Sequence, residues 1–278
     1  MKEIQVASIE PQKLQSKPPT TTTAATAIPT TTNNNSRSTT RHALPLPYPI
    51  HGFNKAVFVG QDKVVTNFVN FIRVFNISKH AYSLTDIKCE GAVACVQTSP
   101  DFHHLAVSVD AVQGAKIVMY DSVEMDKAIR DFSTIILASQ IRISLTNETI
   151  LLFAESEDKQ LCRIVLYAFD GTFLSEISLN LPNPSNSFEI SFCPADETII
   201  CVITNETCYF MRATTNLITV FSTIKFYDLS CHAWVDDVTL GFGTIDGQIR
   251  LYRETVAMEI VNLKSLQDKF VIPRAATV

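Results

Sequence analysis

Residues 243–252 read Gly-Thr-Ile-Asp-Gly-Gln-Ile-Arg-Leu-Tyr, and the fold is decided by this stretch. Its Asp246-Gly247 pair lies between two runs of β-favouring residues, which is the strongest short-range signal for a tight β-hairpin. The second run, residues 248–252, ends in an aromatic residue. The stretch therefore predicts two antiparallel strands, of which the second ends at Tyr252.

Strands that end in an aromatic residue recur along the whole chain. The aromatic ends are Phe75, Tyr120, Tyr167, Phe210 and Tyr252, at intervals of 45, 47, 43 and 42 residues. A period of about 40 to 45 residues is the length of one four-stranded blade in a WD-repeat propeller. The repeat therefore predicts an all-β fold, a WD40-like β-propeller with about five blades.

Each repeat has the same internal order: an apolar strand, a polar turn, a second strand, another turn and the aromatic-ending strand. Turns such as Ser99-Pro100-Asp101 fit this order, because Pro fixes φ and Asp caps the turn with its own side chain. The predicted strands, repeat by repeat, are residues 56–59, 63–68 and 71–76; 94–98, 105–109 and 116–120; 141–145, 150–154 and 163–167; 188–192, 198–203 and 208–211; 232–235, 239–243 and 248–252.

Two further expectations concern residues 123–131 and the innermost strand of each blade. Residues 123–131 fit either one turn of helix or a long loop with an outer strand. The innermost strand of each blade should be covered on both faces by neighbouring blades. We therefore expect it to read as a nearly continuous apolar run, as residues 188–192 do.

The chain has two compositional zones. Residues 1–48 are rich in Thr, Pro and Asn and poor in large apolar residues, so they predict a disordered tail. Residues 49–278 are predicted to form the propeller blades. The five repeats contain no clear closing strand, and residues 270–274, Phe-Val-Ile-Pro-Arg, read like the start of another blade. We therefore expect an incomplete or truncated propeller; a complete five-bladed ring is the alternative.

Composition excludes several classes of partner. The 278 residues are 46% hydrophobic and 18% charged, with a net charge of −5 and no run of basic residues. That balance argues against binding to nucleic acid, which needs clustered Lys and Arg. The apolar runs are under ten residues long, against the roughly 20 that span a bilayer. We expect a cytoplasmic protein with no membrane partner.

Seven cysteines occur without any Cys-x-x-Cys pair, and most lie within apolar runs. Their odd number and spacing argue against a zinc site or a disulfide framework. They are predicted to be reduced, buried and to act as small hydrophobic residues. They are Cys89, Cys95, Cys162, Cys193, Cys201, Cys208 and Cys231.

Motifs of catalysis are absent: the sequence has no Gly-x-Gly-x-x-Gly, no Walker-type loop, no Gly-x-Ser-x-Gly and no His-Glu-x-x-His. His103 and His104 are expected to be turn residues, His232 a hydrogen-bonded structural residue, and the lone Trp234 part of the core. Aspartates in predicted hairpin turns are explained by those turns: Asp110, Asp121, Asp170, Asp236, Asp237 and Asp246. We therefore predict no catalytic, cofactor-binding or metal-binding residues, no cofactor and no small-molecule substrate.

Residues 231–237, Cys-His-Ala-Trp-Val-Asp-Asp, with the stretch 243–252, resemble one blade in the N-terminal propeller of the WD-repeat cilia- and flagella-associated proteins. Residues 49–77 are compatible with the first blade of that family, and the turn at 99–101 fits its second. The similarity covers residues 50–255. It implies a component of the ciliary or flagellar axoneme without enzymatic activity. Family members also carry further blades and a long coiled coil, which this sequence does not contain.

These observations lead to three hypotheses for function. The first is a non-catalytic WD-repeat scaffold that binds other proteins, axonemal or cytoskeletal ones as the resemblance implies. The second is a propeller-fold hydrolase, because propellers also host enzymes. The third is a WD-repeat adaptor outside cilia, for instance in trafficking.

Overall fold

The computed structural model describes residues 56–77, 82–183, 185, 188–204, 206–226, 229–253 and 255–263, which form all-β structure. The tail predicted for residues 1–48 lies outside them. Twenty strands form five sheets of four strands each. In chain order they are β1 (Ala56–Val59), β2 (Lys63–Asn67), β3 (Phe71–Ile77), β4 (Tyr82–Lys88); β5 (Gly91–Thr98), β6 (His104–Ala111), β7 (Gly114–Asp121), β8 (Ala128–Ser133); β9 (Gln140–Ile143), β10 (Thr149–Glu155), β11 (Leu161–Ala168), β12 (Phe173–Asn180); β13 (Glu189–Phe192), β14 (Ile199–Ile203), β15 (Thr207–Ala213), β16 (Ile218–Lys225); β17 (Leu229–Trp234), β18 (Thr239–Thr244), β19 (Gln248–Arg253) and β20 (Val256–Asn262).

Each sheet is an antiparallel meander in which consecutive strands pair in chain order. The five aromatic ends all lie in the third strand of their sheet, so the repeat predicted from them is confirmed. The hairpin between β18 and β19 turns at Gly247, whose φ of 82° is a left-handed conformation that glycine adopts without strain. Residues 123–127 form a loop before the outer strand β8, so the loop alternative holds and the helical one is wrong.

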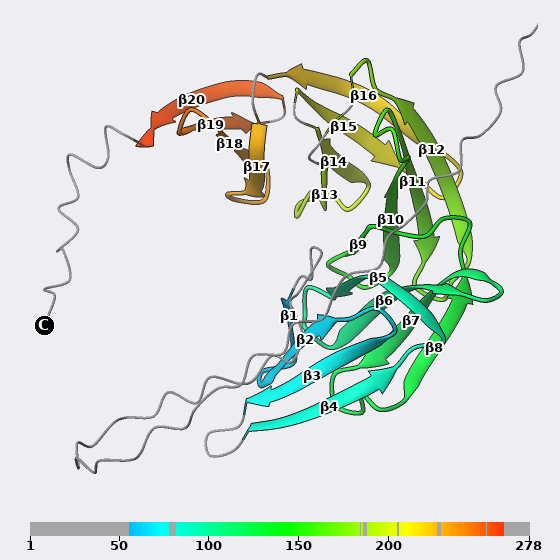
Figure 1. The fold of residues 1–278 in the computed structure, drawn as a ribbon. Helices are drawn as coiled ribbons and strands as arrows, with labels where there is room; N and C mark the ends of the chain where they lie inside the picture. The colour runs from blue at the N-terminus through cyan, green and yellow to red at the C-terminus, as the bar shows by residue number, and fades with distance from the viewer. Residues whose placement is uncertain are drawn as a thin grey trace, which may run out of the picture. The chain divides into compact units, whose positions relative to one another are not determined.

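The five sheets follow one another in an arc, as in a β-propeller, with β1, β5, β9, β13 and β17 on the inside (Figure 1). The fourth strands, β4, β8, β12, β16 and β20, form the outer rim. Among the described residues, no helix has the length and apolar character that a bilayer-spanning segment requires.

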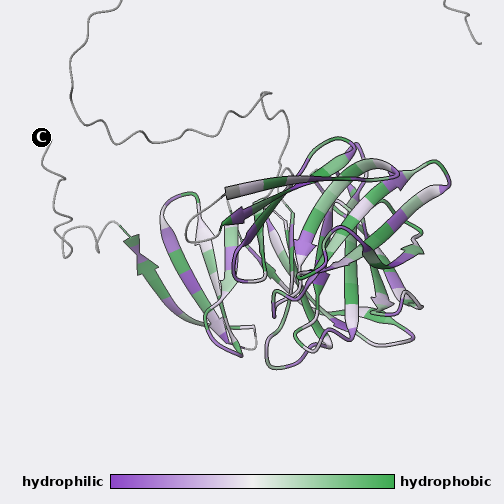
Figure 2. Ribbon diagram, turned by 90° about the horizontal axis from the view of Figure 1, so that it is seen from below, coloured by the Kyte–Doolittle hydropathy of each residue, from purple (hydrophilic) through white to green (hydrophobic). Residues whose placement is uncertain are grey.

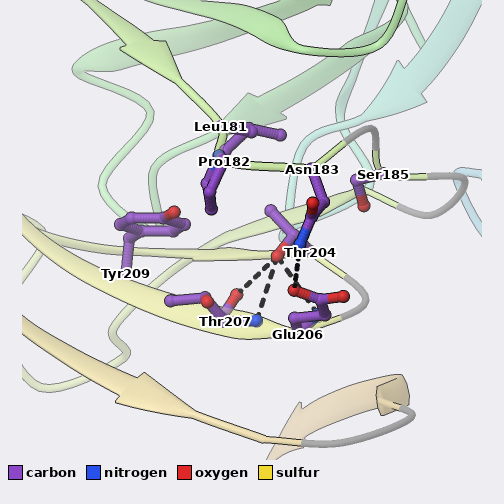
Figure 3. Close-up of a pocket in the computed structure, with 8 residues that line it drawn as sticks. All are labelled: Leu181, Pro182, Asn183, Ser185, Thr204, Glu206, Thr207 and Tyr209. Atoms are coloured by element: carbon purple, nitrogen blue, oxygen red, sulfur yellow. Dashed lines mark hydrogen bonds between the residues drawn. The ribbon is translucent and has the colours of Figure 1, made fainter.

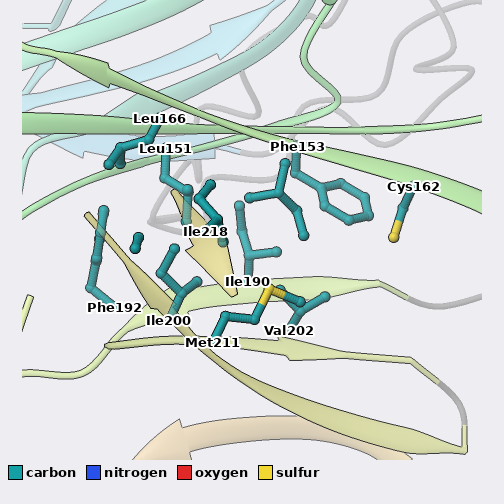
Figure 4. Close-up of a cluster of buried hydrophobic side chains, with 12 residues drawn as sticks. Leu151, Phe153, Cys162, Leu166, Ile190, Phe192, Ile200, Val202, Met211 and Ile218 are labelled. Atoms are coloured by element: carbon teal, nitrogen blue, oxygen red, sulfur yellow. The ribbon is translucent and has the colours of Figure 1, made fainter. Parts of the chain in front are cut away.

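Apolar side chains fill the space between each pair of consecutive sheets. Between the third and fourth sheets, for example, Leu151 and Phe153 of β10 pack with Ile190 of β13 and Val202 of β14 (Figure 4). Similar clusters lie between the first and second, second and third, and fourth and fifth sheets. Within the described part of the chain, neither a core cluster nor strand pairing joins the fifth sheet to the first.

The expectation of a continuously buried innermost strand is wrong, because that burial belongs to the second strand. In β10, residues 150–153 are all fully buried, whereas the innermost strand β9 alternates between buried and half-buried residues. The second strand is paired along both edges and covered on both faces. No described strand pairs with the inner edge of the innermost strand, and the polar residues of β9 take one face.

Phe153 tests this packing directly. We expect Phe153→Ala to lower the free energy of unfolding by about 3 to 5 kcal/mol, because it opens a cavity between two sheets. Urea-induced unfolding followed by circular dichroism measures the loss. Val112→Ala is the matched control, since Val112 is 100% exposed and its loss should stay within about 0.5 kcal/mol. Equal losses for the two variants would contradict the packing described.

Candidate functional site

The innermost strands carry a polar face that bonds each sheet to the next. In β9, Ile141 and Ile143 pack toward the second sheet. The alternate residues turn to the other side, because successive side chains of a strand point to opposite faces. There, Gln140 Nε2 donates to the carbonyl oxygen of Phe188, 2.7 Å away, just before β13.

Arg142 extends this contact across three sheets. Its Nε donates to the carbonyl oxygen of Ile190 at 2.8 Å, and its Nη1 donates to Gln97 Oε1 of β5 at 3.1 Å. Burial lowers the pKa of the Arg142 guanidinium, while the charge of Glu189 opposes this shift. The guanidinium therefore joins the second, third and fourth sheets at the inner edge of the arc.

A second polar group joins the fourth and fifth sheets. Glu189 Oε2 lies 2.7 Å from His232 Nδ1, and Ser191 Oγ lies 2.7 Å from His232 Nε2. The indole Nε1 of Trp234 donates to Ser191 Oγ at 3.0 Å. We call these four residues, two from β13 and two from β17, the inner clamp.

The inner clamp places a serine, a histidine and a carboxylate in the order found in nucleophilic catalysis. Because an indole N–H can only donate, Ser191 Oγ accepts from Trp234, and its remaining O–H and lone pair let it either donate to His232 Nε2 or accept from it. An ionised carboxylate can only accept, so His232 Nδ1–H donates to Glu189 Oε2. The histidine side chain is only 2% exposed. Every polar atom of the imidazole is thereby used in holding two sheets together.

The environment of Glu189 favours its charged form. Burial of the carboxyl group acts to raise its pKa, but the hydrogen bonds and charge of His232 outweigh that effect. The charge of Arg142 acts in the same direction, so the pKa of Glu189 lies below its usual value. The carboxylate thus connects the inner clamp to the contacts that Arg142 makes.

A small pocket lies elsewhere, at the loops that precede β13 and β15 (Figure 3). Within it, Thr204 Oγ1 accepts from the backbone N–H of Thr207 at 3.0 Å and donates to its carbonyl. Asn183 Nδ2 donates to Glu206 at 3.1 Å. The enclosed space holds about one water molecule. These polar groups therefore close a turn, and the pocket offers no room for a substrate.

The histidines and aspartates that the sequence analysis singled out lie in turns or strands. His103 is exposed and His104 is half-buried, with its ring 5.2 Å from that of Phe169. Four of the aspartates accept hydrogen bonds in turns, as expected: Asp121, Asp170, Asp236 and Asp246. Asp110 lies on β6, and Asp237 contributes its backbone carbonyl to Ala195. No group of three or more metal-ligating side chains occurs in the described ranges.

The cysteines were predicted to be buried, which holds for four of the seven. Cys162, Cys193, Cys201 and Cys208 are buried and Cys89 and Cys95 are half-buried. Burial raises the pKa of Cys162 to about 12, so its thiol stays protonated. Cys231 is exposed, which corrects the expectation for that residue.

Sequence reasoning identified His232 and Trp234 but missed Glu189, Ser191 and Arg142. Residues 188–192 were interpreted as an apolar run, although polar residues alternate with apolar ones in it. That alternation is the signal for a strand with one polar face. The bonding partners lie 41 to 48 residues away, so the sequence gives no pairing between them.

Comparison with solved structures identifies the architecture. The WD40 β-propeller domain of Doa1 aligns with a TM-score of 0.53 and 12% identity over 74% of this chain and 67% of that one. The hydrazine synthase of Kuenenia stuttgartiensis aligns with a TM-score of 0.55 and 12% identity over 71% of this chain. This chain covers 63% of that protein, less than two thirds of its length.

The sequence matches no protein-family model and no curated protein. At 12% identity, the two structural matches show the fold alone. The chain therefore has a WD40-like β-propeller fold, and its function has to be argued from its own residues.

Ser191 tests the inner clamp. We expect Ser191→Ala to lower the free energy of unfolding by about 1 to 3 kcal/mol, because Trp234 Nε1 and His232 Nε2 lose their partner in a half-buried site. Chemical denaturation measures the loss. Ser178→Ala on the exposed side of β12 is the matched control and should change stability by less than about 0.5 kcal/mol. If Ser191→Ala lowered the free energy of unfolding no more than Ser178→Ala does, the contacts of the inner clamp would be contradicted.

The lowered pKa of Glu189 predicts an acid-dependent loss of stability. A carboxyl group with a folded pKa below its unfolded value stabilises the fold above the unfolded value, near pH 4.3. That contribution disappears as the pH falls through the folded value. We expect the wild type to lose more stability between pH 6 and about pH 3 than Glu189→Gln does. Denaturation at a series of pH values measures both, and parallel profiles would contradict the prediction.

Proposed function

We propose that this protein is a non-catalytic scaffold that binds other proteins, and that its partners are components of the ciliary or flagellar axoneme. The observation that carries the binding role is a set of exposed apolar side chains on its outer strands. Apolar surface of this kind, when contiguous, is a common feature of protein-binding sites.

The outer strand of the fifth sheet is the clearest case. Val256, Met258 and Ile260 of β20 are 65%, 58% and 62% exposed, and a bulge between Ala257 and Glu259 places Val256 on the opposite face from Ile260. Figure 2 shows hydrophobic residues along this strand, which leads to the C-terminus. Among the described strands, β20 pairs along one edge only, and such an outer edge can accept an additional strand from a partner.

The outer strand of the fourth sheet also carries exposed apolar side chains. Phe221 is 51% exposed and Val220 is 37% exposed on β16. The Arg212 guanidinium lies 5.8 Å from the centre of the Phe221 ring, a cation–π contact that holds the ring at the surface. Aromatic and Arg side chains of this kind are enriched at interaction hot spots.

The described residues give less support to a catalytic role. The serine, histidine and carboxylate of the inner clamp are held by one another and by Trp234, and the histidine is almost fully covered. A reacting group would need access to Ser191 Oγ together with donors for the developing charge. The described pocket lies at other residues and is of water size.

The axonemal part of the proposal rests on the resemblance of residues 231–252 to one blade of the ciliary proteins. In the structure these residues span β17 to β19, where His232 and Trp234 form the inner clamp. A WD-repeat adaptor outside cilia would use the same outer surface and is distinguished by location alone.

Co-sedimentation with salt-washed axonemes tests both parts. We expect the wild type to pellet with axonemes and Met258→Glu/Ile260→Glu to bind at least about tenfold more weakly, since charge on the apolar surface costs 1.4 kcal/mol or more. Val112→Glu, on an exposed hairpin of the second sheet, is the matched control and should bind normally.

Equal binding by all three proteins would reject the β20 surface. Failure of the wild type to bind, with a tagged chain absent from the axoneme in ciliated cells, would reject the ciliary location. Thermal melting of the variants shows whether each remains folded, as expected for substitutions at exposed positions.

A further inference from the structure

The fourth sheet carries two cysteine thiols in direct contact. Cys201 of β14 and Cys208 of β15 are fully buried, and their Sγ atoms lie 3.2 Å apart. The register pairs Cys201 with Phe210 and Ile203 with Cys208, so the two cysteines are diagonal neighbours on one face of the sheet. A disulfide bond holds its sulfur atoms about 2.0 Å apart. The two sulfur atoms would therefore have to approach by only about 1.2 Å to form one.

The fifth sheet protects this pair from oxidation while it covers it. The two thiols belong to the apolar cluster between the fourth and fifth sheets, to which the fifth sheet contributes Leu229, Leu240 and Phe242. Burial raises the pKa of Cys201 well above its usual range, and the adjacent Cys208 thiol acts in the same direction. Because thiolates and not thiols react with oxidants, the covered pair stays reduced.

The cover over the pair is supported on one side only in the part of the chain that the structure describes. There the fifth sheet packs against the fourth alone, whereas the third and fourth sheets each pack between two neighbours. At its inner edge, the fifth sheet is held by the hydrogen bonds of the inner clamp. Segments with few apolar contacts open locally at a lower free energy than the whole fold. We therefore expect the fifth sheet to separate from the fourth before the third and fourth separate from each other.

We propose that Cys201 and Cys208 form a redox-sensitive site, in which separation of the fifth sheet allows hydrogen peroxide to oxidise the pair to a disulfide. One thiolate attacks a peroxide oxygen, the O–O bond breaks, and a sulfenic acid and hydroxide form. The second thiolate then attacks the sulfenic sulfur and displaces its hydroxyl group as hydroxide. The protons of the two thiols convert both hydroxide ions to water, so one peroxide molecule is reduced to two water molecules. This reaction requires neither the axonemal partner nor the β20 surface.

A variant of the inner clamp tests whether the fifth sheet controls this reaction. We expect hydrogen peroxide to link Cys201 to Cys208 about tenfold faster in Ser191→Ala than in the wild type, a factor that corresponds to 1.4 kcal/mol of easier separation. Ser178→Ala, on the exposed side of β12, is the matched control and should react at the wild-type rate.

Peptide mass spectrometry identifies the bond. Cleavage after Glu206 separates Cys201 from Cys208, and cleavage after Arg212 separates Cys208 from the exposed Cys231. A linked pair of peptides that a reductant splits therefore reports the proposed disulfide. Alkylation of the remaining thiols in denaturant, after the peroxide has been removed, shows which cysteines stayed reduced.

Two further measurements separate local opening from unfolding. Cys162, buried between the third and fourth sheets, should stay reduced in the wild type and in Ser191→Ala. In Ser191→Ala/Cys208→Ala, Cys201 has no thiol beside it and should proceed to the irreversible sulfinic acid. Absence of the Cys201–Cys208 bond in Ser191→Ala, or its formation at equal rates in Ser191→Ala and the wild type, would overturn the proposal. Oxidation of Cys162 as fast as that of the pair would overturn it too, because unfolding would then expose all the thiols together.

Discussion

A four-stranded sheet with two apolar faces is stable only when other sheets cover both faces, and this constraint organises the whole structure. The second strand of each sheet expresses it most directly. In β10, Ile150 and Leu152 pack toward the second sheet, while Leu151 and Phe153 pack toward the fourth. A shift of the strand by one residue would exchange the two sets, so packing on both sides fixes its register.

The inner clamp adds specificity where apolar packing is less complete. At the two preceding junctions, the innermost strand of the following sheet presents two large apolar side chains, such as Ile190 and Phe192 on β13. At the junction of the fourth and fifth sheets, β17 presents Leu229 together with the hydrogen-bonding side chains of His232 and Trp234. Hydrogen bonds are directional, so Glu189 and Ser191 admit β17 in one register only. Net stabilisation from each bond is modest, about 1 kcal/mol, so its main effect is to specify the arrangement.

Sequence reasoning recovered the inner three strands of every sheet, but of the outer strands it anticipated only β8, as one of two alternatives. The third strands carry an aromatic residue at a near-constant interval, and the intervening turns carry Pro, Asp or Gly. An outer strand such as β12, Phe-Leu-Ser-Glu-Ile-Ser-Leu-Asn, alternates apolar and polar residues because it lies at the rim. It has neither an aromatic repeat nor a fixed distance from its neighbour, since the connections that follow vary in length.

The continuous apolar run was assigned to the wrong strand for a physical reason. A run of apolar residues indicates burial on both faces, and the innermost position was taken to be the most enclosed. Among the strands that the structure describes, the innermost one is paired on one edge only, and β9 uses one face for polar contacts. The inner clamp was beyond prediction because its bonds join strands some 40 residues apart, and a single sequence carries no record of that proximity.

The second strand of the fifth sheet shows how the same constraint applies to a face without a described neighbour. β10 and β14 place Leu151 and Phe153, or Cys201 and Ile203, toward the following sheet. β18 places Gly241 and Gly243 there, so the sheet itself supplies little apolar volume. A neighbour that packs on this face must therefore contribute large side chains, since close packing leaves no void of side-chain size.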